Sequence, residues 1–169
     1  IGHIITERDV AKARARDAQL LAECGGVVKP TPRQDVQPAL SAGLLAAAPH
    51  PARGTIFPQP LLNLPTGQQA RMDDVLGAGW RVIWSADAGD DFVQATQQHP
   101  LLALTTAKLG TPDLQEAEGV LTNWFHKHGV KAAIVRPDHY IYGVSASAHD
   151  LASQLHELAN GLANGLTSN

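Results

Sequence analysis

The sequence predicts an α/β domain with a central mixed sheet flanked by helices, preceded by a helix and a proline-rich extended arm. Three observations predict this class, and the first is size: the chain has 169 residues, 44% of them hydrophobic, which suits one domain with a buried core. Eight of the eleven prolines lie between Pro30 and Pro65. Beyond residue 66, strand-like apolar runs alternate with helix-like periodicity. We therefore expect a helix and arm over residues 1–60 and a folded domain over residues 61–169.

The first helix is expected over residues 6–23. Thr6 and Asp9 resemble a capping box, in which a hydroxyl accepts from a free amide and an acid lies in the first turn. A weak apolar stripe runs between charges and comprises Val10, Ala13, Asp17, Leu20 and Leu21. Gly25 and Gly26 are typical of a helix end, because glycine readily adopts a left-handed backbone.

Residues 25–60 are expected to form an extended arm that wraps a neighbour. Proline fixes φ and lacks an amide donor, so this segment cannot hold a long helix or a central strand. Only residues 40–48 could form a short helix. A structureless loop of this length is uncommon inside a compact domain, which favours an arm.

The domain that follows contains four expected strands and three expected long helices. Short apolar runs, rich in β-branched and aromatic residues, predict strands over residues 80–85, 101–105, 132–135 and 140–144. Apolar residues at helical spacing predict helices over residues 87–98, 111–128 and 147–162, with Ser145 or Ser147 as the cap of the last one.

Local signals mark the turns and ends of these elements. Thr66 and Gly67 predict a turn, and a short helical segment over residues 71–76 is ended by Gly77. Pro112 suits the first turn of a helix, where its missing N–H costs little. The other two signals are Gly129 at a helix end and a turn over residues 136–139.

The order of these elements is thioredoxin-like. The early strands are joined by helices and are expected to be parallel, while the last two strands form an antiparallel hairpin. The fold would lack a CxxC pair, because Cys24 is the only cysteine. A nucleophilic thiol would be needed at the start of the first long helix, where the segment from Ser85 to Gly89 has none. We expect no redox catalysis, and a buried or half-buried Cys24 thiol.

Charge and composition exclude several classes of function. The chain carries 13 Lys and Arg against 16 Asp and Glu, for a net charge of −3. A mildly acidic chain without a basic cluster is a poor candidate for binding nucleic acid or anionic membranes. No apolar run approaches the ~20 residues that span a bilayer, and no signal peptide opens the chain, so a cytoplasmic protein is expected. Ile1 in place of an initiator Met indicates a fragment or a processed product.

The histidines do not predict a metal site. His126 and His128 are two residues apart, so on a helix their rings would point about 200° away from each other. A last turn of the helix is the better position for them, because histidine tolerates the negative end of the dipole. The others show no ligand spacing: His3, His50, His99, His139, His149 and His156.

Three further patterns have structural interpretations. Gly77-Ala78-Gly79 precedes its strand, whereas a dinucleotide fingerprint follows one. The acid pairs are expected to cap helix starts; these are Asp73-Asp74 and Asp90-Asp91. The tryptophans are spaced as core or interface residues; these are Trp80, Trp84 and Trp124. We assign no catalytic, cofactor-binding or metal-binding residue.

The motifs resemble the C-terminal region of FAD-dependent aromatic hydroxylases. Residues 57–60 (FPQP), then residues 72–77 (MDDVLG) and a strand from Trp80, resemble the first part of that region. Residues 119–125 (GVLTNWF), then residues 133–138 (AIVRPD), resemble its end. The type is that of 3-(3-hydroxyphenyl)propionate hydroxylase, related to phenol hydroxylase.

The resemblance implies a thioredoxin-like C-terminal domain without redox cysteines. It also implies a parent enzyme that uses FAD, NAD(P)H and O₂ to hydroxylate an aromatic ring. The flavin motifs of that family lie upstream of this chain, so no flavin-binding residue carries over. His139 stands where many relatives have glycine, and would be tolerated in a left-handed position.

Three hypotheses about function follow. The first is an accessory domain that packs on the catalytic FAD domain of the parent chain and builds a homodimer. The second is a stand-alone dimerisation or docking module without flavin chemistry. The third is a degenerate glutathione-transferase-like or peroxiredoxin-like enzyme, which would need a thiol-binding pocket near Ser85 or Thr105-Thr106.

Overall fold

The computed structural model describes residues 7–27, 38–99 and 102–167. The chain divides into two compact units, Ile1–Val36 and Gln37–Asn169, each described here by itself. The domain boundary predicted at residue 60 stays a prediction. No helix within the described ranges is both long and apolar enough to cross a membrane.

The first unit contains one described helix, α2 (Val10–Glu23). The Asp9 carboxylate caps it, because Oδ1 accepts from the backbone N–H groups of Ala11 (2.9 Å) and Lys12 (3.2 Å). The helix therefore begins later than predicted, and Thr6 lies outside the described residues. Gly25 and Gly26 follow with φ of 67° and 81°, as predicted for the helix end.

The second unit is built on a four-stranded mixed sheet in the order β4-β3-β5-β6. The strands are β3 (Trp80–Trp84), β4 (Leu104–Lys108), β5 (Ala132–Val135) and β6 (Ile141–Ser145). β3 and β4 are parallel, and β5 and β6 form the antiparallel hairpin, as predicted. β5 also runs antiparallel to β3, which corrects the expectation that the early strands are all parallel.

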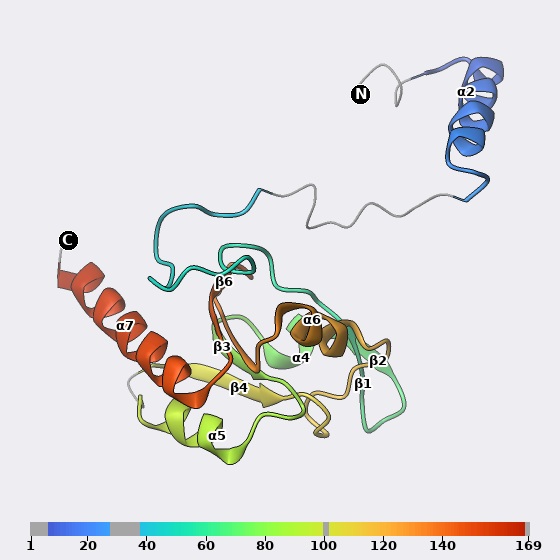
Figure 1. The fold of residues 1–169 in the computed structure, drawn as a ribbon. Coiled ribbons are helices and arrows are strands. Elements are labelled where there is room, and N and C mark those ends of the chain that lie inside the picture. Colours follow the sequence, from blue (N-terminus) through green and yellow to red (C-terminus); the bar gives the residue numbers. More distant parts are fainter. Residues whose placement is uncertain (1–6, 28–37, 100–101, 168–169) are drawn as a thin grey trace. The chain divides into compact units, whose positions relative to one another are not determined.

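Helices cover both faces of this sheet (Figure 1). α5 (Asp90–Gln97) and α7 (Ala148–Thr167) pack on one face with Val82 and Trp84. α4 (Met72–Leu76) and α6 (Val120–His128) pack on the other face with Ile83. Alternate residues of β3 thus enter opposite cores, as the period of two in a strand requires.

Two predicted boundaries are corrected because turns displace the helix and strand starts. α6 begins at Val120, after Gly119 with φ of 71°, and Pro112 lies in a turn of the preceding loop. β4 begins at Leu104, later than the predicted strand, whose first residue lies outside the described ranges. The Ser147 hydroxyl accepts from the Asp150 amide (3.2 Å) at the start of α7, as predicted.

A small hairpin precedes α4 and was not predicted. It consists of β1 (Leu61–Asn63) and β2 (Gln69–Arg71), joined by the predicted turn at Thr66 and Gly67. Both strands have only three residues, too few to show alternation in the sequence. Leu62 is 1% exposed and anchors the hairpin in the core.

The described part of the predicted arm packs on the sheet of its own chain. The backbone N–H groups of Ala46, Gly54 and Phe57 donate to carbonyls in or beside β6, at 2.9 to 3.0 Å. The short helix predicted over residues 40–48 is absent, because the amides of this segment bond to distant residues and Gly43 has φ of 101°. The Phe57 ring packs edge-on against Trp124 at 5.1 Å.

Candidate functional site

A buried arginine gathers four segments of the second unit. Arg81 on β3 is 1% exposed, and its guanidinium donates to the Asp73 carboxylate on α4. Gln59 from the arm also donates to Asp73. His139 Nδ1 lies 2.9 Å from Arg81 Nη2 and 3.2 Å from Asp73 Oδ2. We call these four residues the Arg81 cluster.

The Arg81 cluster depends on the state of the His139 ring. Nδ1 accepts from Arg81 only when it is unprotonated, and donates to Asp73 only when it carries the proton. His139 has φ of 68°, in the left-handed region that glycine occupies most easily and that histidine tolerates. The cluster ties these segments together around the enclosed Arg81, whose Nε has no hydrogen-bond partner among the described residues.

The turn that carries His139 is held by a second ion pair. Arg136 contacts the Asp138 carboxylate at 2.8 Å and donates to the Leu44 carbonyl at 2.7 Å. Burial acts to raise the pKa of Asp138, but hydrogen bonds from Arg136 and the Tyr140 amide outweigh it and hold this pKa below its ordinary value. The turn is thereby tied to the arm.

The segment after β3, where a nucleophilic thiol would be needed, holds a serine instead. The Ser85 hydroxyl donates to Asp87 at 2.6 Å, and Lys131 Nζ lies 3.4 Å from the same carboxylate. The Ser85 hydrogen bond lowers the pKa of Asp87, and Lys131 adds to the effect. A carboxylate of lowered pKa is a weak base, so this arrangement does not activate Ser85 as a nucleophile.

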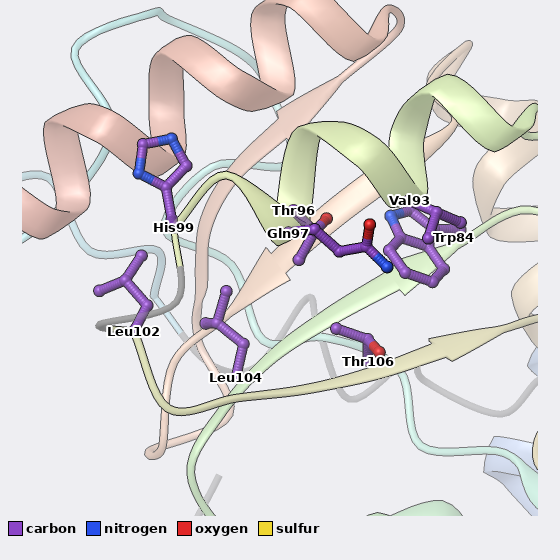
Figure 2. A pocket seen from close by; sticks show the side chains of 8 residues that line it. All are labelled: Trp84, Val93, Thr96, Gln97, His99, Leu102, Leu104 and Thr106. Carbon is purple, nitrogen blue, oxygen red and sulfur yellow. The ribbon is translucent and has the colours of Figure 1, made fainter.

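A hollow of about 160 Å³ opens between α5 and β4 (Figure 2). We call it the α5–β4 hollow; it is lined by Trp84, Val93, Thr96, Gln97, His99, Leu102, Leu104 and Thr106. Trp84 is 6% exposed, and its indole Nε1 has no hydrogen-bond partner among the described residues. A thiol-dependent enzyme would have needed a pocket near Ser85 or Thr105-Thr106; of these residues, Thr106 lines the hollow, and Ser85 and Thr105 do not.

His126 and His128 lie in the last turn of α6, as predicted. The His128 ring packs on Trp124 at 4.8 Å and faces His50 at 5.8 Å. Burial lowers the pKa of His128, and the nearby charges of His50 and Lys127 lower it further. Within the described ranges, no group of three or more His, Cys, Asp or Glu side chains could hold a metal ion.

The other residues singled out in the sequence have structural positions. Cys24 is free and exposed, which corrects the expectation of a buried or half-buried thiol. The acid pairs lie in the first turns of α4 and α5, but neither helix has a side-chain cap hydrogen bond, which corrects the expectation that these acids cap the helices. Trp84 and Trp124 are core residues. The partners of Asp73 were not predicted; their only sequence signal was Arg81, a charged residue inside an apolar strand.

Comparisons with known proteins match most of the second unit. The model of the HcaD C-terminal domain family matches residues 54–161. A probable NADH-specific resorcinol 4-hydroxylase of Rhodococcus jostii (strain RHA1) is 35% identical over 96% of this chain, which spans 31% of that protein. A 3-(3-hydroxy-phenyl)propionate/3-hydroxycinnamic acid hydroxylase of Klebsiella pneumoniae (strain 342) is 29% identical over 63% of the chain, which spans 22% of that protein.

Two solved structures resemble the chain in fold. The flavin-dependent monooxygenase PieE, in complex with FAD and substrate, has a TM-score of 0.57 at 16% identity over 92% of this chain and 31% of its own. Aklavinone-11 hydroxylase, with FAD and aklavinone, has a TM-score of 0.51 at 22% identity over 69% of this chain and 25% of its own. At these identities the likeness concerns the fold alone.

Proposed function

The chain belongs to the HcaD C-terminal domain family, and from this premise we propose that it is the C-terminal accessory domain of an FAD-dependent aromatic-ring monooxygenase. The observation that carries the proposal is the family match over residues 54–161. It is supported by relatives named as hydroxylases, of which the chain spans about a third or less. The parent enzyme would use NADH or NADPH and O₂ to hydroxylate a phenolic compound such as 3-(3-hydroxyphenyl)propionate or resorcinol, in the cytoplasm.

The second unit is proposed to be a thioredoxin-like domain that has no redox role. The sheet order β4-β3-β5-β6, with α5 between β3 and β4 and α6 between β4 and β5, supports this fold. The only cysteine of the sequence, Cys24, belongs to the first unit. The domain therefore has no thiol with which to carry out thiol–disulfide exchange.

Neither the Gly77-Ala78-Gly79 motif nor the α5–β4 hollow fits FAD. Gly77 and Gly79 precede β3, so they do not form the turn from strand to helix that places backbone amides on a pyrophosphate. The α5–β4 hollow, at about 160 Å³, is far smaller than a dinucleotide requires. We therefore place the flavin in the remainder of the parent enzyme, and derive no catalytic step from this chain.

The contribution proposed for this chain is a rigid surface. The Arg81 cluster joins the arm, α4, β3 and the turn between β5 and β6 through side-chain hydrogen bonds. The proposed partners of this chain are the catalytic FAD domain of the parent chain and a second copy of the parent enzyme. Sedimentation of the full-length enzyme, with and without this chain, tests the dimer role: loss of the dimer on deletion is expected, and an unchanged dimer contradicts it.

Two measurements test the proposed function itself. The genomic reading frame should continue upstream of Ile1 into a flavoprotein, and a gene that starts beside this codon would overturn the proposal. The purified 169-residue chain should neither bind FAD in a fluorescence titration nor oxidise NADH or NADPH. Flavin binding, or thiol-dependent turnover with glutathione, would show an activity that an accessory domain does not have.

A further inference from the structure

We propose that the apolar face of α2 docks into an apolar groove on the remainder of the parent chain, outside the 169 residues of this sequence. This inference rests on the proposed function and deepens it, because it names the surface that contacts the catalytic region. It is carried by the exposed apolar side chains of the helix, by the small area of its face, and by the part of a relative to which the helix belongs.

The helix α2, blue in Figure 1, exposes an apolar face. None of its 14 residues is buried, and Val10, Leu20 and Leu21 are 64%, 42% and 43% exposed. Leu20 and Leu21 follow Val10 after about three helical turns, so the three side chains lie along one side of the helix. Half of the large hydrophobic side chains that are exposed within the described residues lie on this face. A helix of this length is marginally stable alone in water, and burial of its apolar face is what stabilises it in a protein.

The charges of α2 are compatible with burial of this face. Asp17 is the one acid of the apolar stripe, and Arg16 Nη2 lies 2.6 Å from its Oδ1, so the carboxylate keeps a cation beside it. The opposite side of the helix is polar and carries Lys12, Gln19 and Glu23. The Gln19 amide donates to the Glu23 carboxylate at 2.9 Å. The helix is thus amphipathic, and only one of its sides suits an apolar partner.

The area of the face favours a partner in the same chain. A helix of 14 residues is about 21 Å long and about 10 Å wide, so one face offers a few hundred Å² at most. Stable complexes between separate chains bury about 800 Å² on each partner. A partner in the same chain needs less area, because the covalent link makes docking an intramolecular step at a high effective concentration. The area therefore favours docking within one chain over pairing of α2 with a second copy.

The comparisons favour the part of the parent chain that lies outside this sequence. The family model begins at residue 54, so α2 lies outside the C-terminal domain that the model describes. The match to the Rhodococcus jostii protein covers 96% of this chain, which is too much for all of α2 to be left out, and 31% of that protein. A helix that belongs to the relative but not to the C-terminal family domain is expected to pack on the remaining part of the enzyme.

The test compares amide hydrogen exchange in the 169-residue chain and in the full-length parent enzyme, by mass spectrometry of peptides. In the 169-residue chain the α2 amides should exchange fast at every protein concentration. In the parent enzyme they should exchange at least about 100-fold more slowly. Fast exchange in the parent overturns the proposal. Slow exchange in the 169-residue chain also overturns it: at every concentration it would place α2 on the second unit, and only at high concentration on a second copy.

Two variants of the parent enzyme separate docking from folding. Leu21→Glu places a charge on the apolar face and should speed exchange of the α2 amides about tenfold or more, with peptides of the second unit unchanged. Ala15→Glu is the matched control, because Ala15 is exposed and lies about 120° around the helix from Leu21, and it should leave exchange unaltered. Slow exchange of α2 in Leu21→Glu, or equal acceleration by Ala15→Glu, contradicts the assignment.

The failure of this inference and the failure of the proposed function give different results. A gene without a flavoprotein upstream overturns both. A flavoprotein parent whose α2 amides exchange as fast as those of the 169-residue chain overturns this inference alone.

Discussion

Removal of the Asp73 carboxylate is expected to destabilise the second unit more than removal of the whole ion pair. Arg81 is 1% exposed and its side chain cannot move to water, whereas Asp73 is 23% exposed. Breaking a buried pair by deleting one partner costs about 3–5 kcal/mol, because a charge stays buried without compensation. Water reaches Asp73 and His139 still contacts Arg81, so we expect about 2–3 kcal/mol for Asp73→Ala.

The double variant distinguishes this reasoning from simple loss of contacts. Arg81→Met keeps an apolar stem, and with Asp73→Ala it leaves no buried charge, so the pair of changes should cost only about 1 kcal/mol. The double variant is therefore expected to be more stable than Asp73→Ala alone. Asp74→Ala, an exposed acid in the same turn, is the matched control and should lie within about 0.5 kcal/mol of the unaltered chain.

Urea unfolding followed by tryptophan fluorescence measures these differences. All three tryptophans lie in the second unit, so the signal reports its unfolding and not that of α2. The reasoning is refuted if Asp73→Ala costs less than about 0.5 kcal/mol, or if the two single changes add in the double variant. Additive costs would mean that another group compensates the charge of Arg81 when Asp73 is absent.

Three further predictions concern single contacts. Gly143→Ala should cost about 1–3 kcal/mol in urea unfolding, because its Cβ would collide with the Gln154 side chain and lie 2.8 Å from the Ala46 Cβ; an unchanged midpoint would contradict the packing. Glu116→Ala should cost about 1 kcal/mol in thermal unfolding, since this carboxylate accepts from two amides at the start of α6 at 2.6 and 2.9 Å, and an unchanged melting temperature would rule out the cap. His128 has a lowered pKa in the folded state, so the fold binds fewer protons than the unfolded chain; stability is present above the ordinary histidine pKa of 6.5 and is lost as the pH falls through the lower folded value. His128→Asn, with His50 unchanged, should reduce the dependence of the unfolding free energy on pH between about pH 4 and 8. An unchanged pH dependence would mean that another group causes it.

Elements with local signals were predicted well. β3, β5 and β6 are short runs of apolar residues between turns, and α2 and α7 end or begin at glycine and serine residues whose backbone preferences act locally. The start of α6 was predicted too early, because a proline that suits a first helical turn also suits the turn in which Pro112 lies.

Features that depend on distant residues could not be predicted. The arm lies along β6 because its amides donate to carbonyls almost a hundred positions away in the chain, such as Ala46 to Tyr142. A local sequence pattern contains no information about such a pairing. The Arg81 cluster likewise needs four separate segments to meet. The α5–β4 hollow is defined by what the core fails to fill, which depends on packing and not on pattern.

Because the arm covers β6, the two edges of the four-stranded sheet differ in how readily a further strand could pair with them. Backbone groups of β6 are occupied by residues 46 and 54, whereas β4 pairs only with β3 within the described residues. Within the described residues, β4 is therefore the more open edge of this four-stranded sheet. Two copies that paired through β4 would use up that edge in both and form a closed twofold pair.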